Sequence, residues 1–208
     1  MTPSSRDRGA RAAATDPRDV HVGSRAEWRA WLAAHHESPD WIWLVYPKKG
    51  SARFTDLTYD ALVEEALCFG WIDSVARGHD ADHAAIRMSP RRPGSGWAAT
   101  NKRRVERLVA DGRMTPAGLA RIEAARRDGS WEALDAVERL QVPADLAAAL
   151  DATPEARRHF DAFPPSARKL ALTWIAAARR PETRASRIAE TARLAARGER
   201  ANQPKERR

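Results

Sequence analysis

The stretch that decides the fold is Trp71–Pro90, "WIDSVARGHDADHAAIRMSP". It holds two runs typical of strands, "WIDSVAR" and "HAAIRMS", and the polar segment "GHDAD" between them predicts a β-hairpin. Upstream, "WIWLVYP" at 41–47 is rich in β-branched and aromatic residues and stops at a proline, which predicts a further strand. Together these runs predict an antiparallel or mixed sheet of at least three strands.

Helical patterns flank the predicted strands. Ser24 and Glu27 have the spacing of a capping box, and the helix they open places Trp28 on an apolar face. A second helix begins at Thr58 and is apolar nearly all round, so it should be mostly buried. From Asn101 onward the chain has helical patterns only, of which "PSARKLALTWIAAARR" is the most amphipathic. We therefore predict an α+β fold: a small antiparallel or mixed sheet with helices in the N-terminal part, followed by an all-helical C-terminal part.

Changes in composition divide the chain into four segments. The first twenty residues have no periodicity and predict a disordered tail. The segment "QVP" at 141–143 is the predicted joint between two folded parts. The predicted segments are a tail at 1–20, an α+β domain at 21–140, a helical domain at 143–198 and a basic tail at 199–208.

Composition limits where the protein acts. The 208 residues carry a formal net charge of +8, and the basic excess lies mainly in 77–107 and 179–208. Cys68 is the single cysteine, which suits a reducing compartment and leaves no cysteine-rich zinc site. No apolar run approaches the roughly 20 residues of a membrane helix, and the N-terminus has no secretory pattern. We therefore expect a cytoplasmic protein without a membrane span; its oligomeric state is not indicated.

Three long segments carry a family resemblance. They are "LTYDALVEEALCFGWIDS", "SPRRPGSGWAATNKRRVERLVADGRMTPAGL" and "RRPETRASRIAETARLAARG". They closely resemble the YdeI/OmpD-associated family, also called the bacteriocin-protection or OmdA family, over roughly Trp28–Gly198. The resemblance implies a bacterial role in resistance to bacteriocins or antimicrobial peptides, and an association with an outer-membrane porin. It implies no catalytic reaction.

A cluster of basic residues predicts a site for an anionic ligand. Arginine offers a planar fork of donors that fits carboxylate or phosphate, and a helix start such as the one near Asn101 favours an anion. The candidate residues are Arg87, Arg91, Arg92, Asn101 and Arg104, with Lys48 as a possible addition. The alternative is a solvated turn whose arginines pair with Asp73 and Glu106.

Two further residues are candidates beside this cluster. Asp73 can orient an arginine or act as an acid or base, although an internal salt bridge to Arg87 or Arg91 explains it as well. Trp97 follows a Gly-Ser-Gly turn and can cover a pocket or stack on a base, whereas core packing is its ordinary role.

The histidines and the C-terminal arginines give weaker signals. His79 and His83 flank a predicted hairpin tip, but no third ligand accompanies them in sequence, so we predict no metal site and no cofactor. Arg180, Arg184 and Arg187 share a helical side and can contact nucleic acid, although no aromatic platform accompanies them.

Three functions remain open. The first is a cytoplasmic, non-enzymatic protein that binds an anionic small molecule or a protein partner and acts in stress or antimicrobial-peptide resistance. The second is an enzyme of unassigned reaction with Asp73 and the arginines in one cleft, and the third is a nucleic-acid binder without sequence preference. We favour the first, because no motif of a common enzyme class is present in the sequence.

Overall fold

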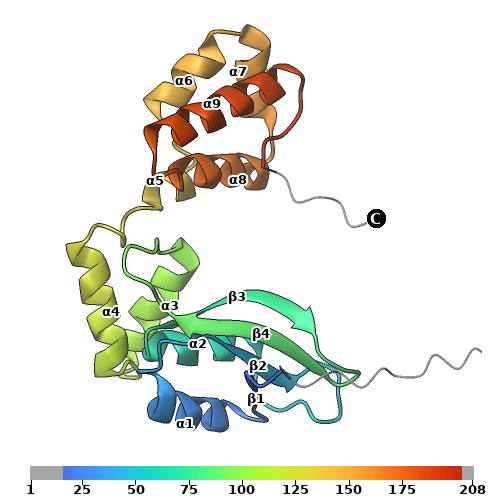
Figure 1. Cartoon of the computed structure of the whole chain (residues 1–208), viewed down its shortest axis with the longest axis vertical. Coiled ribbons are helices and arrows are strands. Elements are labelled where there is room, and N and C mark those ends of the chain that lie inside the picture. Colours follow the sequence, from blue (N-terminus) through green and yellow to red (C-terminus); the bar gives the residue numbers. More distant parts are fainter. Residues whose placement is uncertain (1–15, 203–208) are drawn as a thin grey trace, which may run out of the picture. The chain divides into compact units, whose positions relative to one another are not determined.

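The computed structural model describes residues 16–202, which form two compact units. The N-terminal unit holds the described residues up to Ser95 together with Thr100–Asp128. The C-terminal unit holds Gly96–Ala99 and the chain from Gly129 onward. A mixed sheet with helices makes up the first unit and helices alone make up the second (Figure 1), which confirms the predicted fold class.

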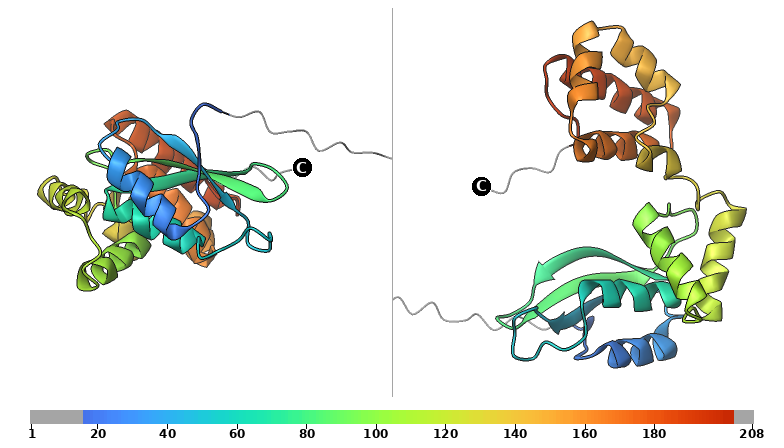
Figure 2. Two further views of the ribbon diagram at one scale, coloured as in Figure 1. Left: turned by 90° about the horizontal axis from the view of Figure 1, so that it is seen from below. Right: turned by 180° about the vertical axis from the view of Figure 1, so that it is seen from behind.

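The N-terminal unit is built on a four-stranded sheet with the order β1-β2-β4-β3. Strand β1 pairs parallel with β2, and the β2–β4 and β3–β4 pairs are antiparallel. The strands are β1 (Asp19–His21), β2 (Ile42–Pro47), β3 (Trp71–Gly78) and β4 (His83–Pro90). Helices α1 (Arg25–His35) and α2 (Tyr59–Cys68) lie on one face of this sheet (Figure 2).

Both predicted tails are ordered over part of their length. Asp19 and Val20 belong to β1, where they pair with Trp43 and Leu44, although the sequence places them in a disordered tail. At the other end, Ala201 is buried in the helical core instead of lying in a solvated tail. The sequence misses both because a three-residue strand and a single alanine show no periodicity. The remainder of these predictions, at 1–15 and 203–208, lies outside the described residues.

The predicted helix caps form in the structure. The side chain of Ser24 accepts from the backbone N–H of Glu27, and that of Thr58 accepts from Ala61. Thr115 caps α4 (Pro116–Arg127) in the same way. Gly118 of α4 lies so close to the end of α2 that a Cβ there would stand 2.3 Å from the carbonyl oxygen of Cys68. The contact between α2 and α4 therefore depends on the absence of a side chain at Gly118.

A buried ionic cluster joins the helices of this unit. Glu64 and Glu65 on α2 are almost completely buried. Glu65 accepts from Arg25 at 2.6 Å, from Arg29 at 2.7 Å and also from Arg113. Glu64 is paired with Arg25, Arg107 and Arg113. Burial alone would raise the pKa of Glu65, but the hydrogen bonds from Arg25 and Arg29 outweigh it and lower that pKa.

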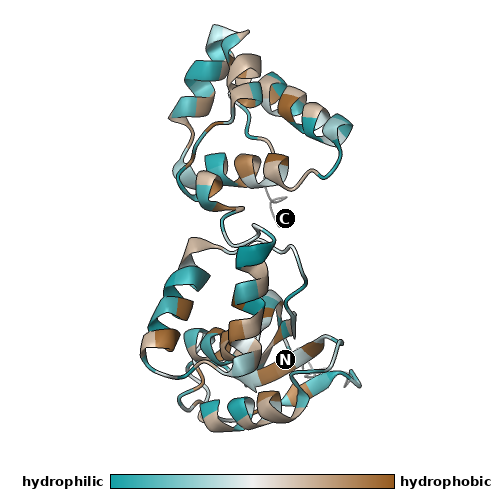
Figure 3. Ribbon diagram, turned by 90° about the vertical axis from the view of Figure 1, so that its left-hand side faces the viewer, coloured by the Kyte–Doolittle hydropathy of each residue, from teal (hydrophilic) through white to brown (hydrophobic). Residues whose placement is uncertain are grey.

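The C-terminal unit is an apolar helical bundle. Its helices are α5 (Asp135–Glu138), α6 (Ala144–Asp151), α7 (Pro154–Ala162), α8 (Pro165–Ala176) and α9 (Pro181–Ala196). Leu146, Leu150, Phe160, Leu172 and Ile175 form the centre of its core. Hydrophilic and hydrophobic residues alternate along these helices (Figure 3), as the sequence pattern of α8 predicts.

Candidate functional site

A pocket of about 650 Å³ opens at one end of the sheet in the N-terminal unit. Ile72 and Ser74 of β3 and Arg87 and Ser89 of β4 line it, so it lies on the sheet face opposite α2. The remaining lining residues are Glu37, Ser38, Pro39, Trp41, Pro90, Arg91, Arg92, Pro93, Ser95 and Arg121. Three of the predicted ligand-binding arginines therefore share one hollow.

Arg87 reaches the pocket because of its register in the sheet. It pairs with Trp43 of β2, and its guanidinium lies 4.2 Å from the ring centre of Trp41. The guanidinium of Arg18 lies 4.0 Å from the same ring. An indole in contact with two guanidinium groups holds their side chains in place, because each contact is a cation–π interaction.

Arg91 is the buried arginine of the pocket. Its backbone N–H donates to the carbonyl of Gly70, and its Nη2 donates to the carbonyl of Ser95 at 3.3 Å. Only 6% of the residue is exposed. Burial lowers the pKa of Arg91 to about 10, and the negative charge of Asp73 opposes this shift. The side chain therefore stays positively charged at neutral pH and places a fixed charge at the pocket wall.

Arg92 and Arg121 complete the positive lining. Arg92 follows Arg91 in the loop after β4, and Arg121 comes from α4; both are exposed. Among the described lining residues Glu37 is the one carboxylate, against four guanidinium groups. The hollow therefore favours a negatively charged occupant.

Three of the predicted residues lie outside this pocket, beside α2. Asp73 alternates with Ile72 along β3, so it faces the helices and accepts from the hydroxyl of Tyr59 at 2.8 Å. Arg104 donates to Asn101 at 2.8 Å and to Asp60 of α2 at 2.5 Å. Neither Asn101 nor Arg104 lines the arginine pocket, because α3 (Ala99–Ala110) packs on the helical side.

Lys48 and Trp97 also lie elsewhere. Lys48 follows β2 at the opposite end of the sheet, where its Nζ donates to the carbonyls of Asp80 and Ala81. Trp97 is 2% exposed and belongs to the C-terminal unit, with its ring centre 4.9 Å from that of Trp131. Core packing, the ordinary role expected of Trp97, therefore accounts for its burial, and Trp97 does not line the arginine pocket.

Sequence reasoning missed Trp41 and Arg121 as pocket residues. Trp41 directly precedes β2 and sits next to β4 only because β2 and β4 pair in space. Arg121 is one of several exposed basic residues on α4, and nothing in its sequence neighbourhood marks it. Its place beside Gly70, where a Cβ would stand 2.6 Å from the Arg121 Cγ, depends on the packing of α4 against the end of α2.

Two other groups of polar residues have defined surroundings. Asp19, His21 and His79 bring their ligand atoms within 4.8 Å of one another, so they can hold a metal ion. In the C-terminal unit, Arg184 forms an ion pair with Asp145 at 2.7 Å. Arg187 donates to the carbonyl of Trp174 and lies over its ring. Two of the three candidate nucleic-acid contacts are thus engaged within the unit.

Comparisons with known proteins separate the two units. Residues 20–121 match a domain family of unknown function, DUF8412. Residues 139–198 match the OmdA family. Its description is Bacteriocin-protection, YdeI or OmpD-Associated, and the match confirms the predicted resemblance over this segment. The OmdA segment lies in the C-terminal unit, whereas the arginine pocket lies in the DUF8412 segment.

Other comparisons give no relatives. No curated protein and no solved structure matches the chain. Within residues 16–202, no helix has the length and apolar character that crossing a membrane requires.

Proposed function

We propose that this is a cytoplasmic, non-enzymatic protein whose N-terminal unit binds an anionic group in the arginine pocket. The observation that carries the proposal is the convergence of four guanidinium groups on one hollow with a single carboxylate among the described lining residues. Such a lining attracts a negatively charged ligand and repels a cation.

The lining also suggests the class of ligand. Guanidinium groups recognise carboxylate and phosphate oxygens through paired N–H donors. Four serines (Ser38, Ser74, Ser89 and Ser95) add hydroxyl groups to the wall, and Trp41 adds an aromatic ring. The pocket volume of about 650 Å³ falls in the range of small-molecule sites. The proposed ligand is a small molecule, or an exposed part of a protein partner, that carries phosphate or carboxylate.

The OmdA segment supports the proposed cellular role. The description of the OmdA family names bacteriocin protection, which supports a role in resistance to antimicrobial peptides. In this proposal the OmdA segment connects the protein to the resistance function and the arginine pocket recognises the ligand. A bacterial strain that expresses the chain should survive a bacteriocin better than a strain that expresses the Arg92→Ala/Arg121→Ala variant at the same level.

Calorimetric titration of the full chain tests the pocket directly. Inorganic pyrophosphate and citrate serve as probes at fixed ionic strength. Loss of one charged hydrogen-bonding partner weakens binding by on the order of tenfold, so we expect that loss for Arg92→Ala and for Arg121→Ala. Both side chains are exposed, so neither substitution should impair folding.

Arg103→Ala is the matched control, because Arg103 is an exposed arginine of α3 that does not line the pocket. It removes the same charge from the same unit. If all three variants lose the same affinity, the binding reflects net charge and the pocket is not the site. Unchanged affinity in both pocket variants would lead to the same conclusion.

The two alternative functions have less support from the geometry. An enzymatic cleft requires Asp73 to line the pocket with the arginines. Asp73 does not line it and faces Tyr59 on the helical side of the sheet, although its charge acts on Arg91. Nucleic-acid binding through α9 requires Arg184 and Arg187, and both make contacts inside the C-terminal unit. A gel-shift assay across a salt series tests the second alternative, and a shift at low salt in the absence of any pocket ligand would revive it.

A further inference from the structure

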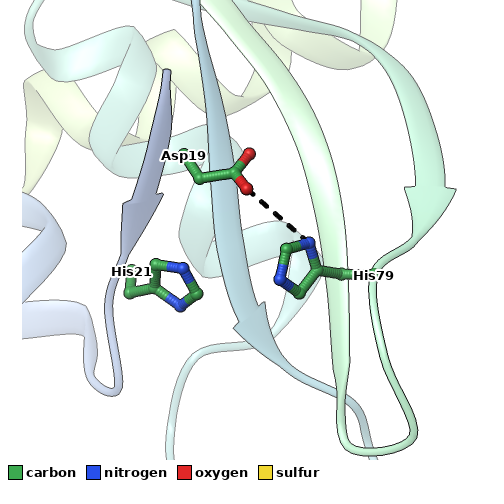
Figure 4. Close-up of side chains that lie close together, drawn as sticks. All are labelled: Asp19, His21 and His79. Atoms are coloured by element: carbon green, nitrogen blue, oxygen red, sulfur yellow. Dashed lines mark ion pairs between the residues drawn. The ribbon is translucent and has the colours of Figure 1, made fainter. Parts of the chain in front are cut away.

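Three side chains with metal-ligand chemistry meet on the sheet face opposite the helices. Asp19 and His21 are two residues apart on β1 and so share one face of the sheet, and His79 follows β3 (Figure 4). Their ligand atoms lie within 4.8 Å of one another, and His79 Nδ1 is 4.0 Å from Asp19 Oδ2. The His21 and His79 rings meet edge to face with their centres 5.5 Å apart.

The topology explains why the sequence hides this cluster. Strands β1 and β3 form opposite edges of the sheet, with β2 and β4 between them. The side chains of β1 and of the β3–β4 hairpin reach toward one another across the two middle strands (Figure 4). Val45 and Ala85 lie on this face and are almost fully buried, although no described helix of the N-terminal unit covers that face. Small side chains on the middle strands therefore leave room for the polar residues that cover them.

We propose that Asp19, His21 and His79 bind one divalent transition-metal ion of the Zn²⁺ class. Two imidazole nitrogens and a carboxylate oxygen are ligands that Zn²⁺ accepts, with bonds of about 2.0–2.2 Å. A tetrahedral site of that size separates neighbouring ligand atoms by about 3.4 Å. Side-chain rotations that shift the ligand atoms by roughly 1 Å would bring them to this spacing.

Neighbouring groups bury and orient the Asp19 carboxylate. The Asp19 side chain is only 2% exposed and that of His79 only 6%. Arg77 Nη2 donates to Asp19 Oδ1 at 3.4 Å, and the backbone N–H of Asp16 donates to Oδ2 at 3.1 Å. These bonds orient the carboxylate and leave lone pairs on Oδ2 that face His79. Metal-binding carboxylates are commonly held in this way by hydrogen bonds from neighbouring groups.

One side of the cluster is open. His21 is exposed and also lines a separate hollow of about 470 Å³, together with His83. Three protein ligands leave a fourth position for water or another small ligand, and this hollow gives access to it. His83 is not one of the three, because among the described residues only the ligand atoms of Asp19, His21 and His79 lie within 4.8 Å of one another. The Nδ1 of His83 instead contacts Asp80 at 2.9 Å. The cluster shares no residue with the arginine pocket, so the two proposals are independent.

Titration of the tag-free full chain with ZnCl₂ in a calorimeter tests the proposal. We expect one Zn²⁺ per chain and at least tenfold weaker binding in His21→Ala and in His79→Ala. His21 is exposed, so its substitution should leave folding intact, and circular dichroism checks this. Zn²⁺ should also raise the melting temperature of the wild-type chain, because a ligand that binds the folded state stabilises it.

His35→Ala and His83→Ala are the controls. His35 is an exposed histidine of α1 outside the cluster, so its removal should change the affinity by less than twofold. The same result is expected for His83→Ala. The proposal is overturned if His21→Ala binds like the wild type, or if several weak sites replace a single one. It is also overturned if His83→Ala abolishes binding while His21→Ala does not, because the hairpin tip alone would then hold the metal.

Discussion

The two units bury different kinds of side chain. In the N-terminal unit Glu64, Glu65 and Arg91 are buried with their charges, whereas the described part of the C-terminal unit buries no charged residue and only Ser130 and Thr191 as polar ones. The C-terminal bundle closes its core with alanine, leucine, isoleucine and phenylalanine. Its ion pairs, such as Arg193–Glu190, lie at the surface.

Among the described residues, the buried charges therefore lie in one of the two units. Burial of apolar side chains accounts for the fold of the C-terminal unit, since its helices bury the faces that their sequence pattern predicts. Buried charges are expensive unless they are paired, so a unit that keeps several of them needs a network that holds them. In the N-terminal unit that network joins α1, α2 and the loop that precedes α4. Both proposed sites lie in the same unit. Substitutions in each unit test how much the buried charges contribute to stability.

Replacement of Glu65 should have the largest effect. Glu65→Ala removes the buried carboxylate that Arg25, Arg29 and Arg113 share, although Arg25 and Arg113 keep their pairs with Glu64. Loss of one partner of a buried pair costs about 3–5 kcal/mol. Urea unfolding measures this loss. The matched control is Glu190→Ala, which breaks a surface pair with Arg193 and should cost less than about 1 kcal/mol. Equal costs for the two variants would remove the distinction between the units.

The same carboxylate should make the stability of the N-terminal unit depend on pH. The pKa of Glu65 is lower in the folded state than in the unfolded chain. Its contribution to stability is therefore present above the ordinary glutamate pKa and is lost as the pH falls through the lowered one. Wild-type stability should fall across this acid range more steeply than that of Glu65→Ala.

A core truncation in the C-terminal unit should have the next largest effect. Leu150 is completely buried, so Leu150→Ala removes apolar contacts and leaves a cavity at a cost of roughly 3 kcal/mol. Because no charge is involved, added salt should leave this difference unchanged, whereas salt should alter the difference caused by Glu65→Ala. Differential scanning calorimetry of both variants at two salt concentrations makes the comparison. A salt-dependent cost for Leu150→Ala would mean that charges also support the C-terminal core.

The sequence predicts the elements of this protein better than its sites. Short patterns of neighbouring residues determine most of the elements. Examples are the hairpin at Trp71–Pro90, the caps at Ser24 and Thr58 and the amphipathic face of α8. The arginine pocket combines β4, the following loop and α4, so only Arg87, Arg91 and Arg92, which are close in sequence, could be grouped in advance.

Distance along the chain explains the remaining failures. Asp73 and Arg87 lie on adjacent strands but face opposite sides of the sheet, and the β-bulge after Asp73 is invisible in the sequence. Asp19 and His79 are separated by most of the N-terminal unit, and β1 is too short to show a strand pattern. Pairing in space, which a single sequence does not reveal, determines both relations.

The smallest predicted effect concerns Tyr59 and tests on which side of the sheet Asp73 lies. Burial, together with the hydrogen bond to Asp73, raises the pKa of Tyr59 to about 12. Its neutral form therefore stabilises the folded state up to the ordinary tyrosine pKa near 10, and this contribution is lost as the pH rises toward 12. Ultraviolet titration of the phenolates should show this group in Tyr46→Phe and lose it in Tyr59→Phe. Asp73→Asn should move the titration of Tyr59 to lower pH and should not weaken pyrophosphate binding, because Asp73 does not line the arginine pocket and its loss removes a negative charge that acts on Arg91. Weaker pyrophosphate binding in Asp73→Asn with no change at Tyr59 would instead put Asp73 among the arginines and restore the enzymatic alternative.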